Sequence, residues 1–134
     1  MLKTVLAVLS GPVVYGLVCV PCNWVIVKLF PSHFDERWQT QHVGLLLLMV
    51  SLTVVYGGAS GLVGGSIAGE HVRMATVGLC VVQLGIGVAV QRQYWEALPL
   101  WYHLSFFVLL LAGIVAGAWL SAGMDQHGVA EGLN

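Results

Sequence analysis

Residues 57–69 read GGASGLVGGSIAG, and this stretch decides the fold that we expect. Four of its glycines recur at every fourth position: Gly57, Gly61, Gly65 and Gly69. Residues at this spacing share one face of an α-helix, and here that face is a groove without side chains. Small residues in this pattern let two membrane helices approach backbone to backbone. The stretch therefore predicts close helix packing inside a membrane.

The composition of the whole chain also indicates a membrane protein. Of the 134 residues, 58% are hydrophobic and only 8% are charged, whereas a soluble domain has about 25% charged residues. Four apolar segments, at about residues 4–30, 42–68, 74–90 and 99–120, occupy most of the length, and about 20 residues suffice to cross the hydrocarbon core. We expect an all-α membrane protein, with four transmembrane helices in one compact, mostly antiparallel bundle over residues 1–120. A flexible polar tail is expected over 121–134.

A second pair of small residues, Gly113 and Gly117, gives the last span its own smooth face. Residues four apart on a helix drift by about 40°, so Gly57 and Gly69 point about 120° apart and cannot both meet one straight partner. We expect the last span to cover one end of the glycine groove, and the first span, bent at its prolines, to cover the other. Gly61→Leu should then disrupt the fold, whereas Gly69→Ala should be tolerated.

Aromatic side chains gather where the predicted spans end. Trp and Tyr concentrate at the headgroup level of membranes. On this ground we assign an interfacial position to Trp38, Tyr94, Trp95, Trp101, Tyr102 and the adjacent His103. Trp38 belongs to residues 32–38, for which we expect a short interfacial turn of helix; the alternative is a polar loop that contains two aromatic residues.

Cys19 and Cys22 form a C-x-x-C pattern in the first span. Their spacing places both sulfur atoms on one helix face, which makes thiol redox or metal handling a hypothesis. Membrane families with such chemistry use a second cysteine pair, and only Cys80 remains here. Apolar surroundings also disfavour the reactive thiolate. Two small buried residues beside a proline are the simpler interpretation.

Few other residues could carry chemistry. No Asp, Glu, Lys or Arg lies at the centre of a predicted span, although coupled transporters normally need one there. The polar residues near mid-membrane are Tyr15, Asn23, Ser51, Thr53, Tyr56, Ser60, Ser66, Thr76 and Gln83; such residues usually bond across helices or to their own backbone. The five histidines lack the spacing of metal ligands on one helix face, and five Lys and Arg cannot form a basic patch. We expect no catalytic, cofactor or metal site and no nucleic-acid partner.

Several short motifs resemble those of a group of small bacterial membrane proteins with four helices. They are LFP at residues 29–31, the Gly-Gly and Ala-Gly steps of the second span, YW at 94–95 and PLWYHL at 99–104. No activity is known for that group. The resemblance therefore implies a fold and a bacterial cytoplasmic membrane, and it implies no chemistry.

The sequence favours a non-catalytic role for a protein embedded in the lipid bilayer. The glycine groove is typical of assembly, so we expect a homo-oligomer or an accessory subunit of a larger membrane complex. Two alternatives stay open. One is a small transporter or channel for an ion or small solute, and the other is thiol redox or metal handling through Cys19 and Cys22.

Overall fold

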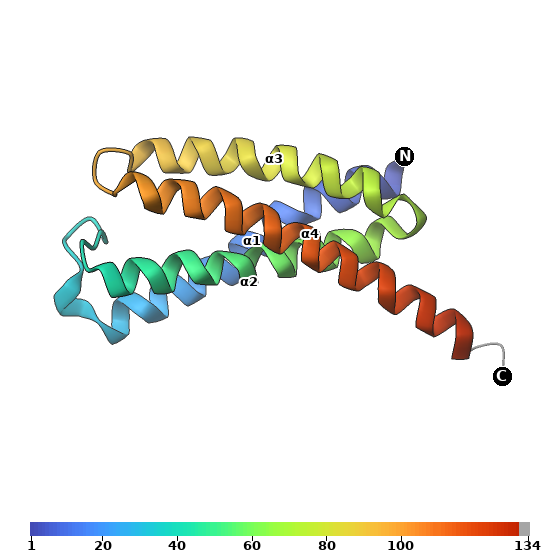
Figure 1. Cartoon of the computed structure of the whole chain (residues 1–134), viewed down its shortest axis with the longest axis horizontal. Helices are drawn as coiled ribbons and strands as arrows, with labels where there is room; N and C mark the ends of the chain where they lie inside the picture. Colours follow the sequence, from blue (N-terminus) through green and yellow to red (C-terminus); the bar gives the residue numbers. More distant parts are fainter. Residues whose placement is uncertain (132–134) are drawn as a thin grey trace.

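The computed structural model describes residues 1–131, and these residues form helices and no strand (Figure 1). The four α-helices are α1 (Leu2–Leu29), α2 (Val43–Ala68), α3 (Val72–Gln93) and α4 (Leu100–Glu131). Two short 3-10 turns, η1 (Pro31–His33) and η2 (Gly69–His71), follow α1 and α2. The expected all-α fold is confirmed.

Three helical segments are long and apolar enough to cross a membrane, where the sequence predicted four. They are Leu2–Leu29, Val43–Gln93 and Leu100–Met124, and they indicate an integral membrane protein. The difference arises at η2, where the helical hydrogen bonding of α2 continues through a 3-10 turn into α3. The second and third predicted spans are therefore one helical segment, which turns back on itself at η2 (Figure 1).

The last helix of the chain is longer than the sequence predicted. α4 continues to Glu131, so residues 121–131 of the expected tail are helical; residues 132–134 lie outside the described residues. No proline follows Pro99, so the sequence has no strong helix breaker in this region. In Figure 1 the last part of α4 extends beyond the other helices.

Glycines bring α2 and α4 into backbone contact. A Cβ atom added to Gly57 would lie 2.7 Å from the Leu110 carbonyl oxygen, and one on Gly113 would lie 2.5 Å from that of Val54. A Cβ on Gly61 would overlap the carbonyl of Ile114. A Cβ on Gly117 would likewise overlap the Gly58 carbonyl, and one on Gly65 would overlap the Ser121 hydroxyl. Only glycine allows this approach.

Another face of α2 receives α1. A Cβ on Gly64 would lie 3.2 Å from the Ala7 carbonyl oxygen, and one on Gly11 would lie 2.9 Å from the Ser60 hydroxyl. The small residues of α2 thus serve two neighbours within one chain. α1 is a single α-helix that continues through both of its internal prolines, Pro12 and Pro21.

Gly69 has a different task from the other glycines of its stretch. It ends α2 with φ 57° and ψ −123°, and a Cβ there would meet nothing within 4 Å. Side chains other than glycine are strained in this backbone region, however open the space. The expectation that Gly69→Ala is tolerated is therefore wrong. The backbone angles of Gly69 restrict substitution there, and its direction relative to the other groove glycines does not matter.

Charged and apolar residues are separated along the length of the molecule. One end, with the N-terminus and η2, carries Lys3, Glu70 and Arg73. The opposite end carries Lys28, Asp35, Glu36, Arg37, Arg92 and Glu96. Exposed apolar side chains cover the helices between them, among them Leu9, Leu17, Val55, Val77, Val81, Val108 and Val115. Such a surface is suited to the hydrocarbon core of a membrane.

Candidate binding cavity

A cavity of about 550 Å³ lies between the C-terminal halves of α1 and α3. This volume is within the range of about 300–1,000 Å³ that is typical of small-molecule sites. α2 and α4 form its inner wall, and the loop of residues 34–40 covers its end. It is therefore built from every helix of the fold.

The cavity exists because α1 and α3 meet at one end and separate toward the other. At the closed end Ala7 packs with Ala75, and a Cβ on Gly78 would lie 2.9 Å from the Val8 side chain. Figure 1 shows the N-terminus of α1 beside the start of α3, whereas the opposite ends of the two helices are far apart. The space that opens between them is lined by side chains of both helices.

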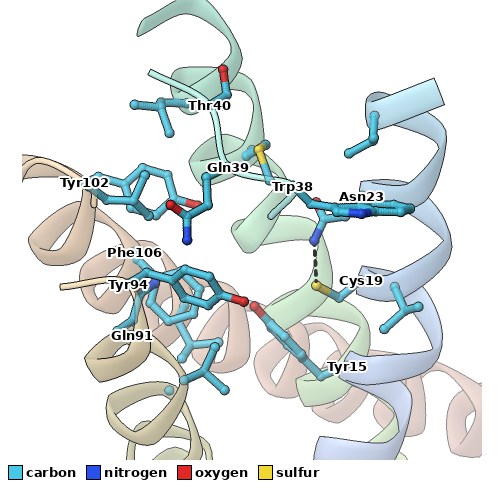
Figure 2. A pocket seen from close by; sticks show the side chains of 18 of the residues that line it. Tyr15, Cys19, Asn23, Trp38, Gln39, Thr40, Gln91, Tyr94, Tyr102 and Phe106 are labelled. Atoms are coloured by element: carbon cyan, nitrogen blue, oxygen red, sulfur yellow. Dashed lines mark hydrogen bonds between the residues drawn. The ribbon is translucent and has the colours of Figure 1, made fainter. Parts of the chain in front are cut away.

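Polar side chains face this space from several elements (Figure 2). α1 contributes Tyr15, Cys19 and Asn23, and α3 contributes Gln83 and Gln91, with Gly87 between them in the cavity wall. In each helix these residues recur at every fourth position, so they form one stripe along the helix. Figure 2 shows the hydroxyl groups of Tyr15 and Tyr94 pointing toward one another. Sequence reasoning missed this pair of facing stripes, although their spacing was the available signal.

Two amide oxygens in the cavity wall are buried without a hydrogen-bond partner among the described residues. Asn23 uses its Nδ2 to donate to Cys19 Sγ over 3.1 Å, and its Oδ1 accepts from nothing. Gln83 is only 3% exposed, and its Oε1 is also unpartnered. A buried polar atom left in this way costs about 1–3 kcal/mol. The sequence predicted that such residues bond across helices or to their own backbone, and the oxygens of these two do neither among the described residues.

The loop over the cavity is organised by Asp35. Its Oδ1 accepts hydrogen bonds from the backbone N–H groups of Arg37 and Gln39, both over 2.8 Å. The backbone N–H of Asp35 in turn donates to the Gln39 carbonyl over 2.9 Å. This compact turn holds Trp38 at φ 62° and carries its side chain to the cavity.

The interfacial helix expected over residues 32–38 is absent, because regular helical structure ends with the three-residue turn η1. Phe34 already has an extended backbone, so Phe34 and Trp38 do not share a helix face. Both instead line the cavity.

The predicted interfacial residues of the second loop separate into two groups. Trp95 and Trp101 are exposed, whereas Tyr102 is buried against Leu46 and Val50, and His103 is only 1% exposed. The apolar wall of α2 thus covers a tyrosine that the sequence placed at the headgroup level.

His103 is held from two sides. Its Nδ1 donates to Gln91 Oε1 over 2.6 Å, and its ring stacks on that of Trp95 at 4.5 Å between centroids. The Nε2 atom is buried and has no hydrogen-bond partner in the described part of the chain. Gln91 therefore links the cavity wall to a buried histidine, and this link was not predicted.

The three cysteines are free thiols in different surroundings. Cys19 lines the cavity, whereas Cys22 and Cys80 are not part of its wall. Within residues 1–124 no three His, Cys, Asp or Glu side chains gather closely enough to hold a metal ion.

Comparison of the chain with protein-family models, with curated proteins and with solved structures finds no match. The resemblance to small bacterial four-helix membrane proteins therefore stays a prediction.

Proposed function

We propose that the chain crosses a membrane four times and binds a small uncharged molecule in the cavity between α1 and α3. This assigns the protein to the class of small solute-binding membrane proteins, of which carriers are the main example. The observation that carries the proposal is the pair of unpartnered amide oxygens, Asn23 Oδ1 and Gln83 Oε1, in the wall of a ligand-sized cavity.

The lengths of α2 and α3 support four crossings. With 26 and 22 residues they extend about 39 Å and 33 Å at about 1.5 Å per residue, and a hydrocarbon core is about 30 Å thick. Glu70, His71 and Arg73 lie at the turn between them, where the chain reverses. Each helix is therefore long enough to cross by itself, which would place the charged turn at one membrane surface.

The lining of the cavity favours an uncharged ligand. Among the described residues the one Asp, Glu, Lys or Arg side chain in its wall is Arg37, which belongs to the exposed loop. The helical part of the wall supplies amides, phenols and a thiol, which are hydrogen-bonding groups without charge at neutral pH. A charged ligand in this position would lose its hydration without gaining a counter-charge.

The wall also favours a closed binding site over a continuous pore. Leu110 forms part of the cavity wall and packs with Leu79 and Ile114, all at most 2% exposed. This cluster blocks the centre of the molecule beyond the cavity. A ligand that enters from the loop end or from the side would therefore stop there unless the helices move.

The sequence favoured a role in assembly with a second copy or another subunit. The glycine groove, which was the reason for that prediction, does not support it in this structure. Gly57, Gly61 and Gly65 lie against α4, and Gly64 lies against α1. Because these contacts are internal, the groove is not free for a second copy or another subunit. Thiol chemistry likewise gains only the position of Cys19 at the cavity.

Analysis of co-purified compounds tests the proposal. Protein purified in mild detergent is denatured, and the released small molecules are measured by mass spectrometry. We expect an uncharged compound from the wild-type protein and about one tenth as much from Gln83→Leu, because one hydrogen-bonding group is lost. Gln93→Leu, the same change at an exposed site of α3, is the matched control. Equal amounts of every compound from all three proteins would contradict a ligand at Gln83.

A further inference from the structure

The side of the cavity between α1 and α3 is walled by exposed apolar residues. On α1 these are Val20 and Trp24, and on α3 they are Ile86 and Val90. All four contribute to the cavity while 45–68% of their surface is exposed. In a membrane this side faces lipid, so the cavity opens sideways into the hydrocarbon core.

The end of the cavity nearest the contact of α1 with α3 carries a buried polar group. Gln83 is almost fully buried there with its Oε1 unpartnered. The cavity therefore has an inner end that offers hydrogen bonds and a lateral opening that offers only apolar contact. A cleft that binds only a lipid tail would instead be apolar at its inner end.

We propose that the ligand is a neutral amphiphile dissolved in the membrane, which places a hydrogen-bonding head against Gln83 and leaves its apolar tail between α1 and α3. This inference rests on the proposed binding function and gives its substrate class. The head is a hydroxyl, phenol or amide type of group, since these donate hydrogen bonds to amide oxygens without a charge.

Two observations favour this orientation of the ligand. Hydrocarbon placed against Gln83 would leave a buried amide unpaired, which is unfavourable. An anionic head would instead be drawn to Arg37 in the loop, which would leave Gln83 Oε1 without a partner. A neutral head directed inward satisfies both ends of the cavity.

The loop of residues 34–40 makes access from water less direct than access from lipid. Asp35 closes the loop on itself with hydrogen bonds to Arg37 and Gln39, and Thr40 at its end is buried. The lateral opening has no such cover, because Val20 and Val90 are exposed. The ligand therefore comes from the membrane.

Three alkylbenzene probes test the class of the head group. The protein is placed in phosphatidylcholine nanodiscs with 4-octylphenol, octylbenzene or 4-octylbenzoate, and its thermal unfolding is measured at equal mole fractions of probe. A ligand that binds the native state stabilises it by RT ln(1 + [L]/Kd) and so raises the unfolding temperature more the tighter it binds. We expect 4-octylphenol to stabilise most, and Gln83→Leu to weaken its binding about tenfold while Gln93→Leu leaves it unchanged.

A pair of matched substitutions on α1 tests the position of the tail. Val20→Trp fills the lateral opening, whereas Val13→Trp adds the same bulk at an exposed site of α1 outside the cavity. We expect Val20→Trp to weaken 4-octylphenol binding about tenfold or more, as loss of apolar contact along the alkyl chain requires, and Val13→Trp to leave it unchanged.

Three results would overturn the inference. The first is stronger stabilisation by 4-octylbenzoate that Arg37→Gln removes, which would indicate an anionic ligand held by the loop. The second is equal loss of binding in Val20→Trp and Val13→Trp. The third is stabilisation by none of the probes. If a polar compound nevertheless co-purifies in a Gln83-dependent manner, the binding function stands and only the substrate class is wrong.

Discussion

The contact of α2 with α4 and the contact of α1 with α3 use small residues in opposite ways. Glycines at Gly57, Gly61 and Gly113 close the first contact until backbone touches backbone. Small residues also join α1 to α3 at Ala75 and Gly78, but beyond that point the two helices separate and larger polar side chains line the space between them. Small residues along the whole contact of α2 with α4 therefore form a continuous close contact, here called the seam. Where small residues are confined to one end, as between α1 and α3, a cavity opens beyond them.

The largest expected effect lies in the seam between α2 and α4. Gly61→Leu places a side chain on the carbonyl of Ile114, and no rotamer removes a clash of Cβ with backbone. We expect a loss of about 4 kcal/mol or more in the free energy of unfolding, or no folded protein at all. Unfolding in mixed micelles, followed by circular dichroism, measures it.

Gly85→Leu is the control for this change, because a Cβ at Gly85 meets nothing within 4 Å and the residue is exposed on α3. It should leave the free energy of unfolding nearly unchanged. If Gly61→Leu unfolds like the wild-type protein and loses only an oligomer, the groove serves a partner and the seam is misassigned.

A smaller loss is expected at Gly69, where the glycine is needed for its backbone angle. Gly69→Ala forces alanine into φ 57°, ψ −123°, which costs about 1–3 kcal/mol. Gly16→Ala is the matched change inside α1, where a Cβ meets nothing, and it should be neutral or slightly stabilising. Thermal unfolding of the two variants separates conformation from space; equal behaviour would remove the special role of Gly69.

These glycines also show which parts of the helix packing could be predicted from the sequence. The four-residue spacing of Gly57, Gly61 and Gly65 predicted close packing, and the spacing of Gly113 and Gly117 identified a face that meets it. The angle at Gly69 was out of reach, because a repeat reports which residues share a face and says nothing of where the helix ends.

The cavity was harder to predict than the seam. Tyr15, Cys19 and Asn23 share a helix face, and so do Gln83 and Gln91, but spacing alone does not reveal that the two faces are opposed and apart. Their separation depends on the crossing of α1 over α2, which is set by contacts such as that of Ala7 with Gly64. Long-range packing of this kind leaves no periodic signal in the chain.

The α1 and α3 region should respond to substitution in the direction opposite to that of the seam. In protein freed of ligand, Gln83→Leu removes a buried oxygen that has no partner among the described residues. We expect the free energy of unfolding to rise by about 1 kcal/mol, while ligand binding falls. Gln93→Leu, exposed on the same helix, should change neither. A drop in stability for Gln83→Leu would mean that its amide supports the fold.

The smallest effect is expected at Cys19, and it separates binding from thiol chemistry. Asn23 Nδ2 donates to Cys19 Sγ over 3.1 Å, and a serine hydroxyl can accept the same hydrogen bond. Cys19→Ser should therefore change the free energy of unfolding by no more than about 0.5 kcal/mol and leave 4-octylphenol binding intact. Cys80→Ser, outside the cavity, is the control for loss of a thiol. One result would contradict this expectation: Cys19→Ser loses the protein's activity in the cell, Cys80→Ser keeps it, and both variants still bind the probe. The Cys19 sulfur atom would then react chemically with the ligand that the cavity binds.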